Sequence, residues 1–478
     1  MLRLPSFFYP LMDIDEAEYA GVVCRMLDGG LPYRDGMMIK FPGILYVYYG
    51  AFALFGRYNM AAVHLVGALA AFCTALACRQ IARRLADEAA GWWAAVLYAI
   101  FSVGFYSKMQ AANTEMFAVL PAALGVLAYV EGRAEPRRLL PLAFVAGLLS
   151  GGAVLFKQPA ALLPLALAAG GLVEALRRRT SIGREVIAGA LLGLGAATTL
   201  AAMALHFALR GILGDAIFWT WTYIWFHYFP SVRDSILLRL LGTPVPLVLS
   251  MAPAVVLALQ ARGERLWPLW WWLAAMFATG FTGGRMFGHY FLLAVPPLCV
   301  LAGIGGVRLW SELDRPRWRA AIVVTTGLLA LGQLVGAALW EASTDSFWSP
   351  KPDYRPAAEF LKKSTRPDER VFIWGRSPVL YVASDRCPST RFVYAHHLAG
   401  ASQAQGGLNA HSVPEGWRQL LEDLERQPPP YIVDTSHGQY DFQYAPIESY
   451  PLLWRIVSEQ YEFETELAGV RFYRRRAR

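Results

Sequence analysis

The chain has 478 residues, of which 56% are hydrophobic and only 17% are charged. Soluble globular proteins carry about 25% charged residues, so this composition excludes an ordinary soluble domain and indicates a polytopic membrane protein. The net charge of +8 does not indicate a nucleic-acid partner, because the basic residues lie in short clusters between apolar runs, as expected for cytoplasmic loops.

The N-terminal region is polar. Residues 13–42 open with several carboxylates and close with a Lys-Phe-Pro sequence, immediately before the apolar runs begin. Ionisable groups beside a bilayer are usually functional, so this segment is the first candidate for chemistry. Residues 43–56 are rich in Tyr and Phe, which predicts a helix lying along the outer leaflet rather than crossing it.

Ten apolar segments follow that are long enough, or nearly long enough, to cross a hydrocarbon core of ~30 Å as helices. Residues 59–342 are therefore predicted to form a transmembrane helical domain. The segments cover residues 59–80, 91–107, 115–131, 139–156, 158–176, 186–209, 244–261, 267–282, 287–307 and 319–340.

Basic residues are concentrated in alternate loops. Arg clusters follow the first, third, fifth, seventh and ninth segments, and the positive-inside rule places these loops in the cytoplasm. By alternation, residues 1–58 and 343–478 are extracytoplasmic. Residues 1–12 are too short to span a bilayer, so we expect a preceding membrane helix to be missing from this sequence through a late assigned start. A short N-terminus translocated unaided is the alternative.

The tail, residues 343–478, changes character. Short β-like runs at 370–374 and 431–434 alternate with helical stretches, which predicts a small soluble α/β domain. The five cysteines include no Cys-x-x-Cys pair, so no zinc or redox motif is predicted. Adjacent His396 and His397 are not expected to share a metal, because neighbouring side chains on a strand point opposite ways.

Four sequence features carry a resemblance to a known family. They are Asp15-Glu16-Ala17-Glu18-Tyr19-Ala20 in the first outer loop, Tyr33 to Lys40-Phe41-Pro42 after it, Phe55-Gly56 before the next segment, and Asn113-Thr114-Glu115 in the second outer loop. With the apolar segments and the external tail, the chain resembles the GT-C superfamily of membrane glycosyltransferases. Within it, the family 39 group of protein O-mannosyltransferases and bacterial aminoarabinose transferases is most similar.

The resemblance implies an inverting glycosyltransferase of a bacterial inner membrane. It would move a sugar from a polyprenyl-phosphate-linked donor to an acceptor at the outer face. Asp15 is then the expected general base or acceptor-orienting carboxylate, with Glu16 beside it, because a carboxylate near low-dielectric surroundings has a raised proton affinity. The alternative is that these acids only keep the loop solvated.

Three basic residues are expected to bind the donor phosphate. Lys40 would stabilise the leaving group as its negative charge develops, although snorkelling to the headgroups is the alternative. Lys157 interrupts an apolar hairpin, where a cation is costly unless an anion pairs with it. Arg285 follows Gly283-Gly284 on an outer turn and could bind phosphate bidentately; the alternative is an ordinary basic residue at a helix end.

Four further residues are expected at the acceptor or the sugar. They are Asn113, Glu115, His289 and Tyr290. Glu115 could also hold a divalent cation, whereas Asn113 could simply cap a helix. The aminoarabinose transferases carry an acidic residue directly before the Lys-containing element, and this chain has Ile39 there. A metal site of that type is therefore not expected, and the need for a metal is left open.

Two other classes of function compete with this interpretation. A transporter or flippase of a lipid-linked sugar would carry polar residues at mid-span and show repeat symmetry between halves. Here the ionisable residues collect at the outer ends of the segments. A structural membrane protein whose tail binds a partner is compatible with the β-α pattern of the tail but is not favoured by it.

Overall fold

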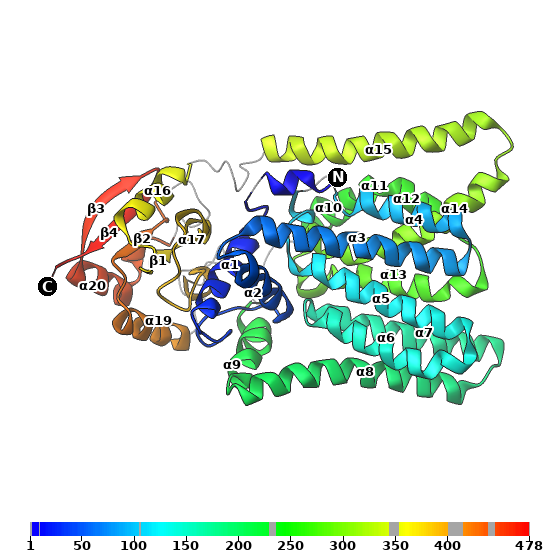
Figure 1. The fold of residues 1–478 in the computed structure, drawn as a ribbon, viewed down its shortest axis with the longest axis horizontal. Coiled ribbons are helices and arrows are strands. Elements are labelled where there is room, and N and C mark those ends of the chain that lie inside the picture. The colour runs from blue at the N-terminus through cyan, green and yellow to red at the C-terminus, as the bar shows by residue number, and fades with distance from the viewer. Residues whose placement is uncertain are drawn as a thin grey trace. The chain divides into compact units, whose positions relative to one another are not determined.

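A computed structural model describes most of the chain (Figure 1), and the residues described form two compact units. Unit 1 comprises Met1–Phe8, His64–His206 and Asp234–Ser343, and unit 2 comprises Tyr9–Val63, Phe207–Arg233 and Thr344–Arg478. Each unit therefore combines segments that are far apart in the sequence. The described residues are 2–8, 10–104, 107–228, 236–343, 353–399, 414–437 and 445–477.

Unit 1 is a bundle of helices (Figure 1). Each of the predicted apolar segments contains one helix or a pair of them, because an apolar run can satisfy its backbone polar groups in lipid only as a helix. The helices are α3 (Met60–Leu85), α4 (Glu88–Phe101), α5 (Thr114–Ala134), α6 (Leu139–Val154), α7 (Leu162–Arg178), α8 (Ile182–Leu209), α10 (Ile236–Gly242), α11 (Pro244–Ser250), α12 (Ala252–Ala258), α13 (Trp267–Thr279), α14 (Val295–Glu312) and α15 (Pro316–Ser343).

Among the described residues, six helices are long and apolar enough to cross a membrane. A seventh span results if the helices within Ile236–Ser250 and Ala252–Ala258, which meet at a bend of 63°, count as one. Helices α4 and α13 are shorter, with 14 and 13 residues. The helical membrane architecture is thus confirmed, while the number of ten spans stays a prediction.

Small residues let the helices of unit 1 approach closely. Helix α4 packs against α14, and α5 packs against α6. Gly303 of α14 lies so close to α4 that a Cβ atom there would be 2.7 Å from the backbone oxygen of Ala90. Because lipid tails are as apolar as the helices, tight van der Waals packing at such positions holds membrane helices together.

Unit 2 contains a four-stranded sheet in the order β1-β2-β4-β3. Strands β1 and β2 pair in parallel, and the other two pairs are antiparallel. The predicted β-like runs at 370–374 and 431–434 form β1 and β2. The strands are β1 (Phe372–Trp374), β2 (Tyr431–Asp434), β3 (Tyr461–Leu467) and β4 (Val470–Arg475).

Helices from the N-terminal region and from the tail share unit 2. Helix α1 packs against α2 and also against α17 of the tail. The helix predicted over 43–56 is present as α2, and its location at a membrane interface stays a prediction. The helices are α1 (Ile14–Leu27), α2 (Gly43–Phe55), α9 (Leu213–Ile217), α16 (Arg355–Ser364), α17 (Val379–Ser384), α18 (His396–Ala399), α19 (Pro414–Arg426) and α20 (Pro451–Gln460).

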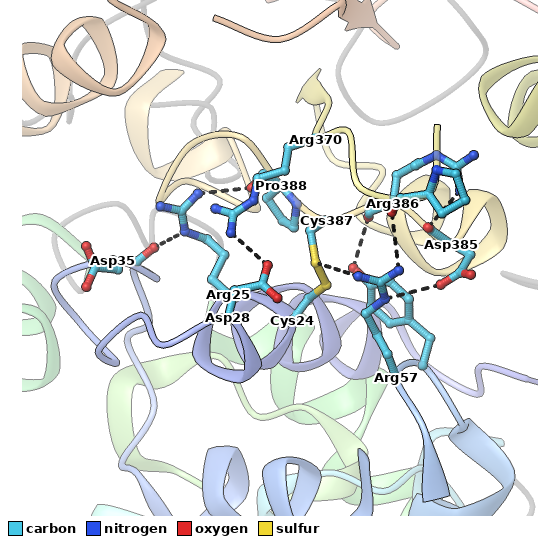
Figure 2. The surroundings of a disulfide bond; sticks show 12 residues. Cys24, Arg25, Asp28, Asp35, Arg57, Arg370, Asp385, Arg386, Cys387 and Pro388 are labelled. Carbon is cyan, nitrogen blue, oxygen red and sulfur yellow. Dashed lines mark hydrogen bonds and ion pairs between the residues drawn. A yellow bond between two sulfur atoms is a disulfide. The ribbon is translucent and has the colours of Figure 1, made fainter. Parts of the chain in front are cut away.

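A disulfide bond joins α1 to the tail within unit 2 (Figure 2). It links Cys24 and Cys387, whose Cα atoms are 5.7 Å apart although they are separated by 363 residues in the sequence. No spacing motif predicts this pairing. Since the bond fixes the C-terminal half of α1 to the tail, it restrains the helix that also carries the first-loop carboxylates.

Candidate active site

The acidic cluster, Asp13, Asp15, Glu16 and Glu18, lies at the start of α1 in unit 2. Asp13 occupies the N-cap position, where its Oδ1 accepts a hydrogen bond of 2.7 Å from the backbone N–H of Ile14. Acidic side chains are favourable at a helix N-terminus, because the unpaired N–H groups there carry partial positive charge. The sequence therefore places its carboxylates where the helix itself stabilises them.

Asp15 faces Lys40 within unit 2. The Lys40 Nζ and Asp15 Oδ2 atoms are 3.7 Å apart, and the two side chains remain 18% and 24% exposed. The phenol of Tyr33 donates a hydrogen bond of 2.9 Å to the backbone carbonyl of Lys40, which holds this segment in place. The structure thus brings together the predicted base and one predicted phosphate ligand, and leaves both partly accessible.

Glu16 is fully buried, unlike Asp15. Its Oε2 accepts a short hydrogen bond of 2.6 Å from the backbone N–H of Met12. Charge-assisted bonds of this kind are among the stronger ones, so Glu16 holds the segment that precedes α1. A direct catalytic function for Glu16 stays a prediction.

Glu18 lies against residues that the sequence did not associate with it. Its Oε1 is 3.8 Å from the Nε2 atom of His397, and the Nδ1 atom of His397 is 3.0 Å from the Tyr223 hydroxyl. His397 belongs to α18, so the expectation of a strand at this position is wrong. Nothing local in the sequence indicates these contacts, because the three residues come from three distant segments of unit 2.

Two tail residues extend this polar region. The guanidinium Nε of Arg376 donates a hydrogen bond of 2.8 Å to the Tyr394 hydroxyl. Burial raises the pKa of Tyr394 to about 12; Arg376 opposes this rise, while Glu18 and Asp15 add to it. The Tyr394 hydroxyl therefore keeps its proton at neutral pH, and it lies within electrostatic range of Asp15, the predicted base.

A second charged group lies in unit 1. The Lys157 Nζ atom is 2.5 Å from Glu115 Oε1, with the side chains only 10% and 3% exposed. The same ammonium lies 3.6 Å from the centroid of the Tyr290 ring. Three predicted site residues from distant parts of the chain are therefore in contact. Burial of such charges is tolerated because they are paired and because an aromatic face also contacts the cation.

The remaining predicted residues also belong to unit 1 and are buried. Asn113 is the N-cap residue of α5, but its side chain does not make the capping hydrogen bond. The ring of His289 meets that of Tyr290 edge-on, with centroids 4.8 Å apart. Arg285 follows Gly283 and Gly284, whose φ angles of 72° and 68° require glycine. A turn at these glycines precedes Arg285, whose function in phosphate binding stays a prediction.

One further cluster in unit 2 has the composition of a metal site. Ligand atoms of Asp434, His437 and Glu448 all lie within 4.8 Å of one another. However, the guanidinium of Arg471 is 3.2 Å from Glu448 and 3.1 Å from His437. Arg471 thus supplies the cation in this arrangement. We interpret it as an ion-pair network, and the need for a metal stays open.

Part of the chain matches a known protein family. The family described as dolichyl-phosphate-mannose-protein mannosyltransferase matches residues 40–204. No curated protein sequence matches the chain at a significant level. The matched region includes Lys40, Glu115 and Lys157, and it covers about a third of the chain.

Solved structures resemble the chain over nearly its whole length. ArnT from Cupriavidus metallidurans bound to undecaprenyl phosphate shares 15% identity and a TM-score of 0.63, covering 96% of this chain and 93% of ArnT. Its apo state gives 16% identity and a TM-score of 0.65, with coverages of 96% and 92%.

A more distant match is the Archaeoglobus fulgidus oligosaccharyltransferase tethered to an acceptor peptide. It has 13% identity and a TM-score of 0.51, with 96% of this chain and 70% of that chain covered. At identities this low, the structural matches show a shared fold. The predicted resemblance to membrane glycosyltransferases of the GT-C superfamily is confirmed.

Proposed function

We propose that the protein is a GT-C type glycosyltransferase that moves a sugar, with inversion, from a polyprenyl-phosphate-linked donor to an acceptor at the outer face of the membrane. The observation that carries the proposal is the partly exposed pair of Asp15 and Lys40. It occurs in a fold shared with ArnT, one structure of which contains undecaprenyl phosphate. The family match, described by a dolichyl phosphate sugar, supports the same class of donor.

The pair suggests how the reaction begins. Lys40 stabilises ionised Asp15 before the donor arrives. When the donor phosphate binds Lys40, it takes the place of Asp15 beside the ammonium, and the Asp15 carboxylate becomes available to the acceptor. Asp15 then accepts the proton of the acceptor hydroxyl while the acceptor oxygen bonds to the anomeric carbon. The bond from that carbon to the phosphate oxygen breaks, and Lys40 stabilises the departing polyprenyl phosphate.

Inversion sets a geometric requirement on this scheme. The base and the leaving group must lie on opposite faces of the sugar, and two groups 3.7 Å apart leave no room for a sugar between them. Lys40 and Asp15 therefore separate as the donor enters. A partly exposed pair is suited to this, since its charges are held by little more than about 1 kcal/mol.

The other predicted residues keep their proposed functions. Glu16 is proposed as the second catalytic carboxylate, beside Asp15. Lys157 and Arg285 are proposed to bind the donor phosphate. The sugar or acceptor ligands proposed from the sequence are Asn113, Glu115, His289 and Tyr290.

We further propose that residues 1–58 and 343–478 are extracytoplasmic and that residues 59–342 span the membrane. The disulfide between Cys24 and Cys387 supports this orientation. Structural disulfides persist outside the cytosol and are rare within it.

The test is the release of polyprenyl phosphate by the purified full chain when it is offered a panel of polyprenyl phosphosugars together with an envelope extract as acceptor. Asp15→Asn should lower the rate by about 10²–10⁴-fold, the usual contribution of a general base. Release also separates transfer from transport, because a flippase would move the donor without cleaving it.

Asp368→Asn is the matched control. Asp368 is an exposed carboxylate of unit 2 that pairs with Arg366, so this variant should retain full activity. Undiminished transfer by Asp15→Asn would refute the assignment of the base. Absence of release with every donor would refute the proposed function itself.

A further inference from the structure

A polar pocket of about 460 Å³ lies in unit 2 at the C-terminal end of α1. Its walls come from the end of α1 and the loop after it, from Arg370, which lies two residues before β1, and from the end of α19. Three arginines, Arg25, Arg370 and Arg426, face two carboxylates, Asp28 and Asp35, across this space. Figure 2 shows the part of the pocket next to the disulfide.

Arg25 carries a buried charge that lacks a carboxylate partner. The residue is only 4% exposed, and its guanidinium donates to the backbone carbonyls of Asp35 and Pro388 (Figure 2). Among the described residues, none of the carboxylates forms an ion pair with it. Burial, together with the neighbouring charge of Arg370, lowers the pKa of Arg25 to about 10, although the charges of Asp423 and Asp35 oppose this shift. A buried cation in this state is stabilised by any anion that enters the pocket.

The two other arginines are more accessible and are only partly neutralised. Arg370 pairs with Asp28 at 2.7 Å and is 20% exposed. Arg426, at the end of α19, is 64% exposed and lies 3.3 Å from Asp423, which is itself already bound by Arg391 at 2.8 Å. The three arginines and two aspartates that line the pocket give it a net charge of +1.

The pocket is held rigid next to its buried charge. Arg25 follows Cys24, so the disulfide to Cys387 fixes the backbone beside it (Figure 2). The loop after α1 turns at Gly29, where φ is 89°, and a Cβ at Gly30 would lie 2.8 Å from the carbonyl oxygen of Arg25. Preorganised donors bind with less loss of entropy than mobile ones.

The volume and the lining define the ligand. A carboxylate or phosphate group alone would fill a small part of 460 Å³. The rest is lined by Asp28, Asp35 and Gln427, whose side chains accept hydrogen bonds from hydroxyl groups. This combination suits a saccharide that carries one anionic group.

We propose that this pocket binds an acidic saccharide, with its carboxylate or phosphate held by Arg25, Arg370 and Arg426. Helix α1 carries both Arg25 and Asp15, ten residues apart, which corresponds to about 15 Å along the helix axis. The bound saccharide is accordingly a distal part of the acceptor, a statement that rests on the proposed function.

Binding to the full-length protein in detergent tests the pocket without requiring activity. Glucuronate and glucose 1-phosphate are titrated against the wild type by calorimetry, with glucose and inorganic phosphate as reference ligands. One or both acidic sugars should bind at least about tenfold more tightly than glucose, since hydrogen bonds to charged groups contribute about 1.5–3 kcal/mol. Which of the two binds identifies the anionic group. Inorganic phosphate binding as tightly as the sugars would overturn the saccharide class, and equal binding of glucose would overturn the anion site.

Arg426→Glu should weaken binding of the acidic sugar by at least about tenfold, because it reverses the net charge of the pocket. Arg418→Glu is the matched control. Arg418 is an exposed arginine of the same helix that pairs with Glu415 and Glu422, so the variant makes the same charge change outside the pocket. Equal losses in the two variants would overturn the proposal.

Transfer kinetics test whether the bound saccharide is part of the acceptor. In the transfer assay, Arg426→Glu should raise the KM for the acceptor with kcat unchanged. Weakened sugar binding together with an unchanged acceptor KM would refute the acceptor assignment while the pocket stands. Failure of all transfer would refute the proposed function and leave the binding result intact.

Discussion

Each unit of the molecule contains a lysine paired with a carboxylate, and the two pairs differ in ways that matter for chemistry. In unit 1, Glu115 and Lys157 are 2.5 Å apart and at most 10% exposed. In unit 2, Asp15 and Lys40 are 3.7 Å apart, with side chains 24% and 18% exposed. The first pair, which we call the closed pair, is buried and in close contact, whereas the second, the open pair, is more widely separated and partly exposed.

The difference in burial decides which pair can exchange partners. Separating two charges in a low-dielectric interior costs several kcal/mol, because each then lacks both its partner and water. Separating a partly solvated pair costs about 1 kcal/mol or less. The Asp15–Lys40 pair can therefore open for a substrate at a lower cost than the Glu115–Lys157 pair.

The largest expected effect on stability comes from breaking the closed pair. Glu115→Gln should destabilise the protein by about 3–5 kcal/mol, because it leaves the Lys157 ammonium buried without its partner. Thermal unfolding in detergent measures this. The double variant Glu115→Gln with Lys157→Met should recover most of the loss. An unchanged melting temperature in Glu115→Gln, accompanied by lost transfer, would instead favour the acceptor function predicted for Glu115.

The disulfide should contribute the next largest effect. Replacing Cys24 and Cys387 by Ser should reduce stability by about 2–4 kcal/mol, since the bond limits the unfolded chain. Reducing agent should lower the melting temperature of the wild type and leave the double variant unaffected. If reduction acted equally on both, the bond would not be the source of the effect.

The open pair should affect stability less than the closed pair or the disulfide does, and it should affect activity more. Lys40→Gln should change stability by no more than about 1 kcal/mol, while the KM for the lipid-linked donor rises by about tenfold or more as a charge-assisted phosphate contact is lost. A melting temperature that falls as far as that of Glu115→Gln would show that the two pairs do not differ.

The smallest effect is a pH dependence in unit 2. Asp434 raises the pKa of His437 above its ordinary value of 6.5. Because the folded-state pKa is raised, protonated His437 stabilises the folded protein fully below pH 6.5. This stabilisation is lost as the pH rises through the folded-state pKa. The melting temperature should therefore fall slightly between pH 6 and pH 8 in the wild type. His437→Gln should reduce this fall.

The sequence predicts the helices better than the contacts between them. Runs of apolar residues suffice to indicate where helices form, because lipid allows the backbone few alternatives. The proximity of Asp15 and Lys40 is anticipated, since both lie in one short segment. The contacts of α1 with Cys387, Tyr394 and His397 are not, because tertiary packing across more than 360 residues leaves no local pattern to read.

In the candidate site, too, local sequence patterns indicate the residues but not the contacts between them. Charged residues at the ends of apolar segments indicate Glu115, Lys157 and Arg285 as candidates, because charges are rare in such segments. That Glu115 and Lys157 bind one another depends on how α5 packs against its neighbours. Likewise, the burial of Glu16, in contrast to Asp15, depends on how α1 packs against its neighbours in unit 2.

The covalent link between Cys24 and Cys387 also constrains how the protein is made. The two cysteines are separated by 363 residues. At ribosomal speeds of about 5–20 residues per second, Cys387 is therefore synthesised roughly 20–70 s after Cys24. During that interval the nascent first loop has to be kept from pairing with other thiols. In the proposed orientation, the early segment thus matures only after Cys387 has been exported, which makes oxidative folding factors a natural requirement for its biogenesis.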